Sequence, residues 1–234
     1  MEIIIRASGE RTEKDCIKSC EQQGNVHIIR AFPFGESIRQ TYELAMTFRQ
    51  EWIPVIDADV VLDYGTLVQG TNEVKLTPGC RGKLFCYDGK TDDKIMMNHR
   101  RAGVHIYRTS LLEIALKYID SSQLKPESHI RRQMAKQGFP TFTGKTIFGT
   151  HDHNQYYKDL WRKSVCQTKK LERMIQKYST RDKWQKLART DKDYKVILAA
   201  HDWALKNNPE IIIDSRIDYD AEEQVKKLGL AEKI

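Results

Sequence analysis

Two aspartates stand directly after a short apolar segment. Residues 52–56 are mostly apolar, and Asp57-Ala58-Asp59 follows them. Such a segment predicts a buried strand, and open α/β sheets bind ligands at the carboxyl ends of their strands. If the strand continues, alternation places both carboxylates on one side of it. Because neighbouring carboxylates repel each other, we expect Asp57 and Asp59 to hold Mg²⁺ or Mn²⁺, which would in turn bind a diphosphate.

A histidine cluster far along the chain offers a further ligand to the same cation. His151 and His153 flank Asp152, and two histidines at this spacing share a face on an extended segment but not on a helix. Imidazole is a common ligand of divalent metals. We expect His151 to be the ligand, because Asp152 and the residues after it look like the cap and start of a long helix; His153 is the alternative. The competing structural interpretation is a pair of turn aspartates and two surface histidines.

An alternation of apolar strands and amphipathic helices is expected to position these groups. The first 56 residues show strand–helix–strand–helix–strand periodicity, which predicts a parallel sheet with right-handed crossovers and a Rossmann-like, nucleotide-binding start. Neither the glycine-rich dinucleotide fingerprint nor a P-loop is present, so ordinary dehydrogenases and P-loop kinases are disfavoured. The predicted segments are strands at Glu2–Ala7, Val26–Ala31 and Trp52–Ile56, with helices from Thr12 to Gln23 and over Glu36–Gln50.

Helices dominate the later part of the chain. A strand is expected at Gly103–Tyr107 and a helix from Pro126 to just before Gly138, followed by a long periodic helix over His153–Tyr178. Two further helices, a short edge strand at Ile211–Ile213 and a last helix after Asp220 complete the prediction. We therefore expect an α/β fold with a mostly parallel central sheet: a nucleotide- and metal-binding domain at residues 1–155 and a C-terminal helical extension at residues 156–234.

These motifs together resemble the GT-A-fold glycosyltransferases, closest in layout to the family 2 type. Ile3–Arg11 resembles the strand and turn that hold the nucleotide, and Ser37–Gln40 opens the helix before the D-x-D strand. Ile56–Asp59 resembles the D-x-D core, Pro126–Phe139 the "ED…R…G" segment, and Gly149–Gln155 the late histidine segment that completes the metal site. The resemblance covers roughly residues 1–165 and implies transfer of a sugar from a nucleoside-diphosphate sugar, with Mn²⁺ or Mg²⁺ as cofactor.

The resemblance also implies roles for particular side chains. Glu127-Ser128 replaces the family's Glu-Asp pair, so Glu127 would be the remaining candidate for the base that deprotonates the acceptor; the alternative is an acid that favours the first helical turn. A retaining enzyme would not need this base. The turn at Ser8 belongs to the nucleotide edge, and arginine suits phosphates and bases. The expected donor-binding residues are Arg6, Ser8, Arg11, Arg39 and Asp57, and Tyr107 and Arg108 are weaker candidates for the acceptor side.

The charge distribution leaves the acceptor open. The chain carries 39 Lys plus Arg against 32 Asp plus Glu, a net charge of +7, and residues 151–200 alone carry that excess. A basic segment attracts phosphates, nucleic acid or an anionic membrane surface, or is simply a solvated helical face. The acceptor could therefore be a glycan, a lipid-linked phosphate or a nucleic acid. The alternative functions are a sugar-phosphate nucleotidyltransferase and a nucleic-acid-binding protein without catalysis.

Composition and cysteine usage predict a cytosolic protein. Apolar residues make up 40% and charged residues 30% of the chain, which is ordinary for a globular protein. No apolar run approaches the roughly 20 residues of a membrane span, and the first residues do not look like a signal peptide. The five cysteines are odd in number and show no zinc-site spacing, so we expect free thiols at Cys16, Cys20, Cys80, Cys86 and Cys166.

Overall fold

A computed structural model of the chain describes residues 1–77, 82–212, 214 and 216–233. The chain divides into two compact units, which are described separately. The first unit comprises Met1–Lys94 and Asn98–His153, and the second comprises Ile95–Met97 and Asn154–Ile234. Cys80 lies outside the described residues, whereas Cys16, Cys20, Cys86 and Cys166 are buried free thiols.

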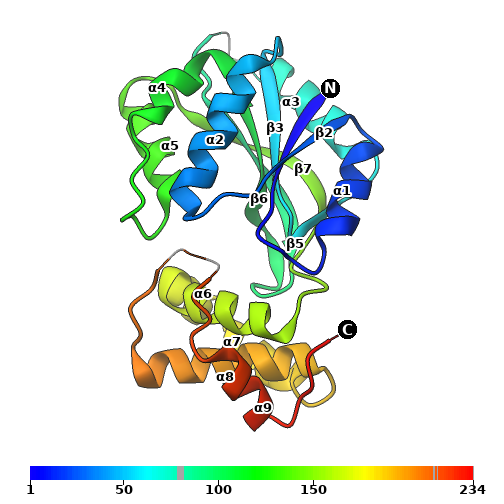
Figure 1. The fold of residues 1–234 in the computed structure, drawn as a ribbon, viewed down its shortest axis with the longest axis vertical. Helices are drawn as coiled ribbons and strands as arrows, with labels where there is room; N and C mark the ends of the chain where they lie inside the picture. Colours follow the sequence, from blue (N-terminus) through cyan, green and yellow to red (C-terminus); the bar gives the residue numbers. More distant parts are fainter. Residues whose placement is uncertain (78–81, 213, 215, 234) are drawn as a thin grey trace. The chain divides into compact units, whose positions relative to one another are not determined.

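The first unit is built on a mixed β-sheet (Figure 1). Within the described residues, the sheet has seven strands in the order β2-β1-β3-β6-β5-β7-β4. The pairs β1–β2, β1–β3 and β5–β7 are parallel, whereas β3–β6, β5–β6 and β4–β7 are antiparallel. The strands are β1 (Glu2–Arg6), β2 (Asn25–Ile29), β3 (Trp52–Asp57), β4 (Val60–Leu62), β5 (Cys86–Asp93), β6 (Asn98–Arg108) and β7 (Thr141–His151).

The sheet therefore has fewer parallel pairs than the expected mostly parallel arrangement. The reason is the short connection between β5 and β6, because a few residues can join antiparallel neighbours only. Strand β6 thus runs against β3 and β5, and β1, β3, β5 and β7 all run in one direction. Consequently the carboxyl ends of β1, β3, β5 and β7 lie at the same edge of the sheet.

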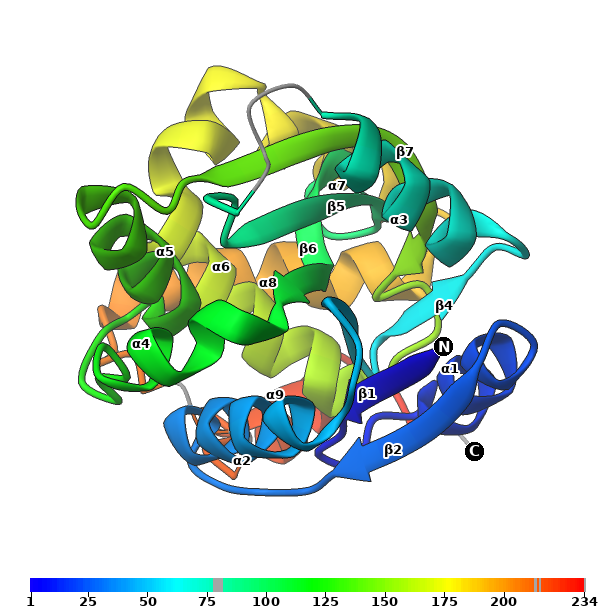
Figure 2. The same ribbon diagram turned by 90° about the horizontal axis from the view of Figure 1, so that it is seen from above.

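Helices cover both faces of this sheet (Figure 2). Cys16 of α1 and Leu67 of α3 pack on one face with Ile5, and Ile38 of α2 and Ile130 of α5 pack on the other with Ile4. Successive strand residues point to opposite faces, which explains why the isoleucine-rich β1 is buried on both sides. The helical elements are α1 (Glu13–Glu21), α2 (Phe34–Thr47), α3 (Thr66–Leu76), η1 (Thr109–Leu111), α4 (Leu112–Leu116) and α5 (Pro126–Lys136).

The residue that precedes α1 does not cap this helix with its side chain. Thr12 occupies the N-cap position but makes no side-chain cap hydrogen bond. Its hydroxyl instead donates to the carbonyl oxygen of Ala58 at 2.9 Å. Thr12 therefore ties the loop after β1 to the turn after β3, which are the two segments that carry the predicted nucleotide edge.

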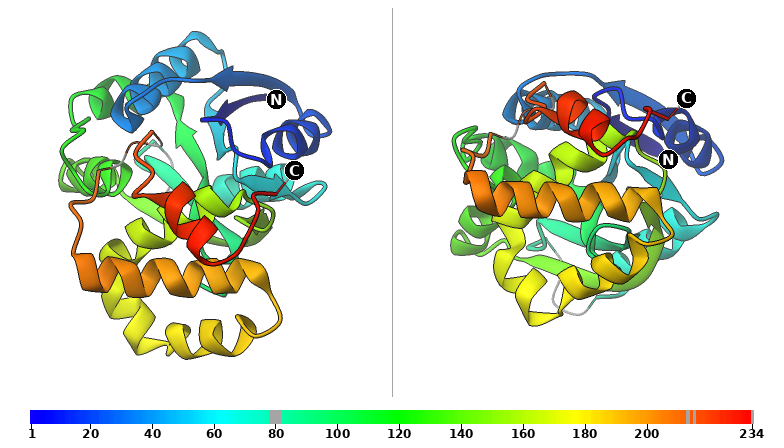
Figure 3. Two further views of the ribbon diagram at one scale, coloured as in Figure 1. Left: turned by 60° about the horizontal axis from the view of Figure 1, so that its bottom comes forward. Right: turned by 90° about the horizontal axis from the view of Figure 1, so that it is seen from below.

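The second unit consists of helices around a core of its own (Figure 3, yellow-green to red). Trp161 and Trp184 are buried in it, and their indole N–H groups donate to the carbonyl oxygens of Tyr219 and Ile95. Helix α6 contains a non-helical residue at Leu171. Ile211 and Ile212 form no strand, and Ile213 lies outside the described residues. The helices are α6 (Tyr157–Lys177), α7 (Thr180–Leu187), α8 (Lys192–Asn207) and α9 (Ala221–Lys227).

Among the described residues, no helix combines the length and the apolar character that crossing a lipid bilayer requires.

Glu73 of α3 ties that helix to β7 and provides a test of the fold. Its carboxylate accepts hydrogen bonds from the Tyr87 hydroxyl, the Lys145 backbone N–H, and the backbone N–H and hydroxyl of Thr146, over 2.7–3.2 Å. Burial raises the pKa of Glu73, but these donors outweigh it and hold that pKa below its ordinary 4.5. The charged form is therefore the stabilising one.

We expect E73Q to lower the free energy of unfolding by about 1–2 kcal/mol at neutral pH. Because the folded pKa lies below the unfolded one, this difference is fully present above the ordinary pKa of 4.5 and disappears as the pH falls through the folded value. Urea unfolding of E73Q and of the exposed control E21Q, at pH 7 and at acidic pH, measures it. A loss that does not depend on pH would contradict the conclusion that the charged form of Glu73 stabilises the fold.

Candidate functional site

Four chemically important side chains stand at or next to the ends of strands that run in one direction. Arg6, Asp57, Asp93 and His151 are the last residues of β1, β3, β5 and β7. The register pairs Arg6 with Asp57 and Asp93 with His151. These residues therefore meet at the carboxyl edge of the sheet, where open α/β sheets bind their ligands.

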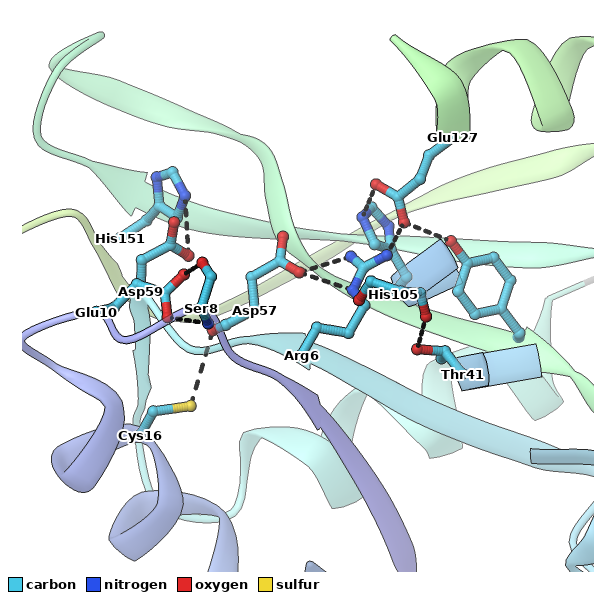
Figure 4. A network of polar contacts seen from close by, with 12 residues as sticks. Arg6, Ser8, Glu10, Cys16, Thr41, Asp57, Asp59, His105, Glu127 and His151 are labelled. Carbon is cyan, nitrogen blue, oxygen red and sulfur yellow. Dashed lines mark hydrogen bonds and ion pairs between the residues drawn. The ribbon is translucent and has the colours of Figure 1, made fainter. Parts of the chain in front are cut away.

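Asp59, His151 and Asp152 form one group at this edge. One oxygen or nitrogen from each lies within 4.8 Å of the others. Figure 4 shows the side chains of Asp59 and His151 facing each other. His151 Nε2 lies 3.4 Å from Asp59 Oδ1, and His151 Nδ1 lies 3.2 Å from Asp152 Oδ2. Burial lowers the pKa of His151, but Asp152 and Asp59 outweigh it and hold that pKa well above its ordinary value. Two carboxylates and an imidazole are a donor set that suits Mn²⁺ or Mg²⁺.

Asp152 has a different position from the one expected. The sequence predicted it as the cap of the long helix, but that helix begins at Tyr157 with Tyr156 at its N-cap. Asp152 is instead buried, has a left-handed backbone with φ of 62°, and its N–H donates to the Asp59 carbonyl oxygen at 3.0 Å. The sharp turn after β7 thus directs the Asp152 carboxylate back toward His151. His153, the alternative ligand, is 43% exposed and faces Asp92 at 3.6 Å.

Asp57 belongs to a second group. Strand β3 ends at Asp57 and the chain turns at Ala58 and Asp59, so the alternation argument for two carboxylates on one side does not apply. Arg6 donates from Nε and Nη2 to Asp57 Oδ1 at 2.9 and 2.6 Å, and Figure 4 shows Asp57 turned toward Arg6 while Asp59 faces His151. Burial raises the pKa of Asp57, against the attraction of Arg6.

Glu127, at the start of α5, lies in contact with the same arginine. Its Oε1 accepts from Arg6 Nη1 at 2.8 Å and from the Tyr107 hydroxyl at 3.0 Å, and its Oε2 lies 3.3 Å from His105 Nε2. Burial raises the pKa of Glu127, but Arg6 and His105 outweigh it, so that pKa lies well below its ordinary value. The carboxylate is therefore held charged by fixed partners on both oxygens.

Strand β5 supplies residues that the sequence analysis missed. Asp88 Oδ1 accepts from His105 Nδ1 at 2.6 Å and from Arg131 Nη1 at 2.9 Å, which extends the Glu127 network into the sheet. Burial lowers the pKa of His105, but Glu127 and Asp88 together raise it well above its ordinary value. Polar residues predominate in Cys86–Asp93, so this segment lacks the apolar pattern from which a buried strand is predicted.

Ser8 and Arg39, two further predicted donor-binding residues, make their described side-chain contacts to glutamates near them in the sequence. The Ser8 backbone N–H and hydroxyl both donate to the Glu10 carboxylate, at 2.7 and 2.5 Å. Arg11 is half-buried beyond this turn. Arg39 lies on α2, 45% exposed, with Nε 3.6 Å from Glu36. Arg108, one of the weaker acceptor candidates, is buried and pairs with Glu51.

Comparison with known proteins shows the class of fold. No family model and no curated protein matches the sequence. Among solved structures, the mannosyltransferase PcManGT from Pyrobaculum calidifontis in complex with GDP-Man and Mn²⁺ gives a TM-score of 0.51 at 10% identity, covering 98% of this chain and 76% of that one. S. aureus TarS 1-349 gives 0.41 at 12% identity, covering 97% and 77%, and a cytidylyltransferase from Leptospira borgpetersenii gives 0.39 at 14%, covering 92% and 79%.

The chain therefore has a GT-A-like fold, and glycosyltransferases are among its structural neighbours. This confirms the fold class that the sequence motifs implied. At these identities the likeness concerns the fold, and function depends on the side chains at the sheet edge.

Gly103 of β6 makes room for the His151 ring. Its φ is +67°, and a Cβ there would lie 2.4 Å from Val60 Cγ2 and 3.3 Å from His151 Cδ2. We expect G103A to lower the free energy of unfolding by about 2 kcal/mol more than G138A, because overpacking adds to backbone strain. Gly138 is the matched control, since it has φ of +85° but no atom within 4 Å of a Cβ. Equal losses in thermal unfolding would contradict the predicted overpacking.

Proposed function

We propose that this protein is a glycosyltransferase that uses a nucleoside-diphosphate sugar and a divalent cation. The observation that carries the proposal is the group of Asp59, His151 and Asp152 at the carboxyl edge of a GT-A-like sheet. Asp59 and His151 are 92 positions apart in the sequence but meet there. Hydrophobic residues could fill a buried strand end at no loss of stability, so stability alone does not explain these polar side chains. A solved neighbour of the same fold was captured with GDP-Man and Mn²⁺, which supports this choice of donor class and metal.

Asp59, His151 and Asp152 would hold the cation. Bound there, it would stabilise the negative charge that grows on a leaving diphosphate. Asp57 was predicted both as a ligand of this cation and as a donor-binding residue. Since Arg6 engages its Oδ1 through two N–H groups, we propose that Asp57 contributes to donor binding, with its orientation set by Arg6. Ser8, Arg11 and Arg39 stay candidates for contacts to the donor.

The contacts of Glu127 favour a role in holding Arg6 rather than in removing a proton from the acceptor. A general base must reach the proton of the acceptor and have a pKa near the working pH. Both oxygens of Glu127 are in contact with Arg6, Tyr107 or His105, and its pKa is lowered well below the ordinary range. We therefore propose that Glu127 fixes the Arg6–Asp57 pair rather than acting as the base suggested by its place in the sequence.

A thermal-shift panel of UDP-, GDP-, ADP- and dTDP-sugars, each with and without Mn²⁺, tests the proposed function. A ligand that binds only the folded state stabilises it by about 2.7 kcal/mol at 100 times its Kd. We expect one nucleotide class to raise the melting temperature in the presence of Mn²⁺, and D59N to abolish that metal-dependent rise while the exposed control D63N keeps it. An unchanged response of D59N, or pyrophosphate release from a nucleoside triphosphate and a sugar phosphate, would contradict the proposal.

The variant E127Q separates the two roles of Glu127. If Glu127 holds Arg6, the loss of its charge should lower the free energy of unfolding by about 2 kcal/mol and weaken the nucleotide-sugar response found in the panel. A lost base would instead leave donor binding intact and slow only the transfer step. Urea unfolding and donor titration of E127Q and of the exposed control E113Q distinguish these outcomes.

A further inference from the structure

Asp93 lies behind His151 and is not accounted for by the site described above. It is the last residue of β5 and is 1% exposed. The register pairs it with His151 on β7 and with Asn98 on β6, so it sits between two strands at the carboxyl edge. Its sequence neighbour Asp92 has a side chain that is 47% exposed. The two aspartates therefore differ completely in environment.

One carboxylate oxygen of Asp93 contacts both His151 and Arg100. His151 Nδ1 lies 2.8 Å from Asp93 Oδ2, and Arg100 Nε donates to the same oxygen at 2.6 Å. Arg100 reaches Asp93 from β6, and its side chain is only 17% exposed. Since Oδ2 already accepts from both partners, it is engaged in orienting His151 and Arg100 rather than in holding an ion.

This arrangement determines which nitrogen of His151 is presented to Asp59. His151 Nδ1 faces two carboxylates, Asp93 at 2.8 Å and Asp152 at 3.2 Å, so a hydrogen on Nδ1 is donated on that side of the ring. When a cation replaces the proton on Nε2, the lone pair of Nε2 is the ligand position, and Nε2 is the atom that faces Asp59 at 3.4 Å. The ring has little room to rotate, because Cδ2 lies against Gly103, where even a Cβ would come within 3.3 Å. The hydrogen bond and the packing thus point the same nitrogen in the same direction.

We propose that Asp93 is the positioning residue of His151, and that Arg100 anchors Asp93 in turn. The proposal rests on the proposed function in one respect, which is that His151 Nε2 binds a divalent cation together with Asp59. Partners that hydrogen-bond to a metal-bound histidine typically contribute 10- to 100-fold to metal affinity, because they fix the tautomer and the ring orientation. Arg100 and Asp93 would supply that contribution here.

Mn²⁺ titration of the full chain, followed by the electron paramagnetic resonance signal of free Mn²⁺, tests this proposal without any sugar substrate. The variants are D93N and R100Q, and the chain offers matched controls one residue away, D92N and R101Q. Asp92 and Arg101 are exposed neighbours on the same two strands, and neither is in contact with His151 in the described structure. Thermal unfolding without metal, measured in parallel, shows whether each variant is folded.

We expect D93N to weaken Mn²⁺ binding by at least about tenfold and R100Q by a smaller factor, with both controls within about twofold of the unaltered protein. The unfolding data separate positioning from general support, because a merely structural residue would lower the melting temperature without changing the affinity of the folded fraction. If D93N does not fold, R100Q carries the test. Unchanged affinity in the folded variants would overturn the proposal and leave the proposed function standing, whereas no Mn²⁺ binding by the unaltered protein would overturn both.

Discussion

The Arg6 guanidinium lies between two carboxylates, and the arrangement of the sheet edge depends on it. It is buried at the end of β1 and donates to Asp57 on one side and Glu127 on the other. Taking a guanidinium out of water costs several kcal/mol, and only close carboxylates with good geometry offset that cost. Asp57 therefore stays with Arg6, and the α5 N-terminus stays close to β1 because Glu127 contacts the same group. The side chain of Asp57, 26% exposed, keeps part of its surface available at the edge.

The same constraint separates the two aspartates of the D-x-D segment. Asp57 follows Arg6, while the turn after β3 carries Asp59 toward β7, where His151 and Asp152 meet it. The backbone reinforces this division, because the Ala58 N–H donates to the Arg6 carbonyl oxygen and the Asp152 N–H to that of Asp59. Two aspartates only two positions apart in the sequence thus have different electrostatic partners, and each can have its own role at the edge.

Sequence patterns predicted the parts of this structure that depend on local chemistry. The apolar runs of β1 and β3 and the proline that begins α5 were placed correctly. His151 was preferred over His153 on the expectation that the long helix starts at Asp152, whereas that helix starts at Tyr157. The patterns were insufficient where long-range contacts decide. Strand β5 was missed because buried Asp88 and Asp93 break its apolar pattern, and their burial depends on His105, Arg131 and Arg100, which no local rule reveals.

The group around His151 is better explained by a ligand than by folding. Buried ionic clusters contribute little more to stability than apolar residues of the same volume, and each added charge must find a partner. Yet Asp59, Asp93 and Asp152 come from three separate segments to surround one imidazole, at the edge where sheets of this kind bind ligands. If these acids served folding alone, burying them close together would lower stability without a compensating gain. A divalent cation would make Asp59 and Asp152 ligands, since hard cations prefer such oxygens, and the imidazole, oriented by Asp93, would add a nitrogen ligand.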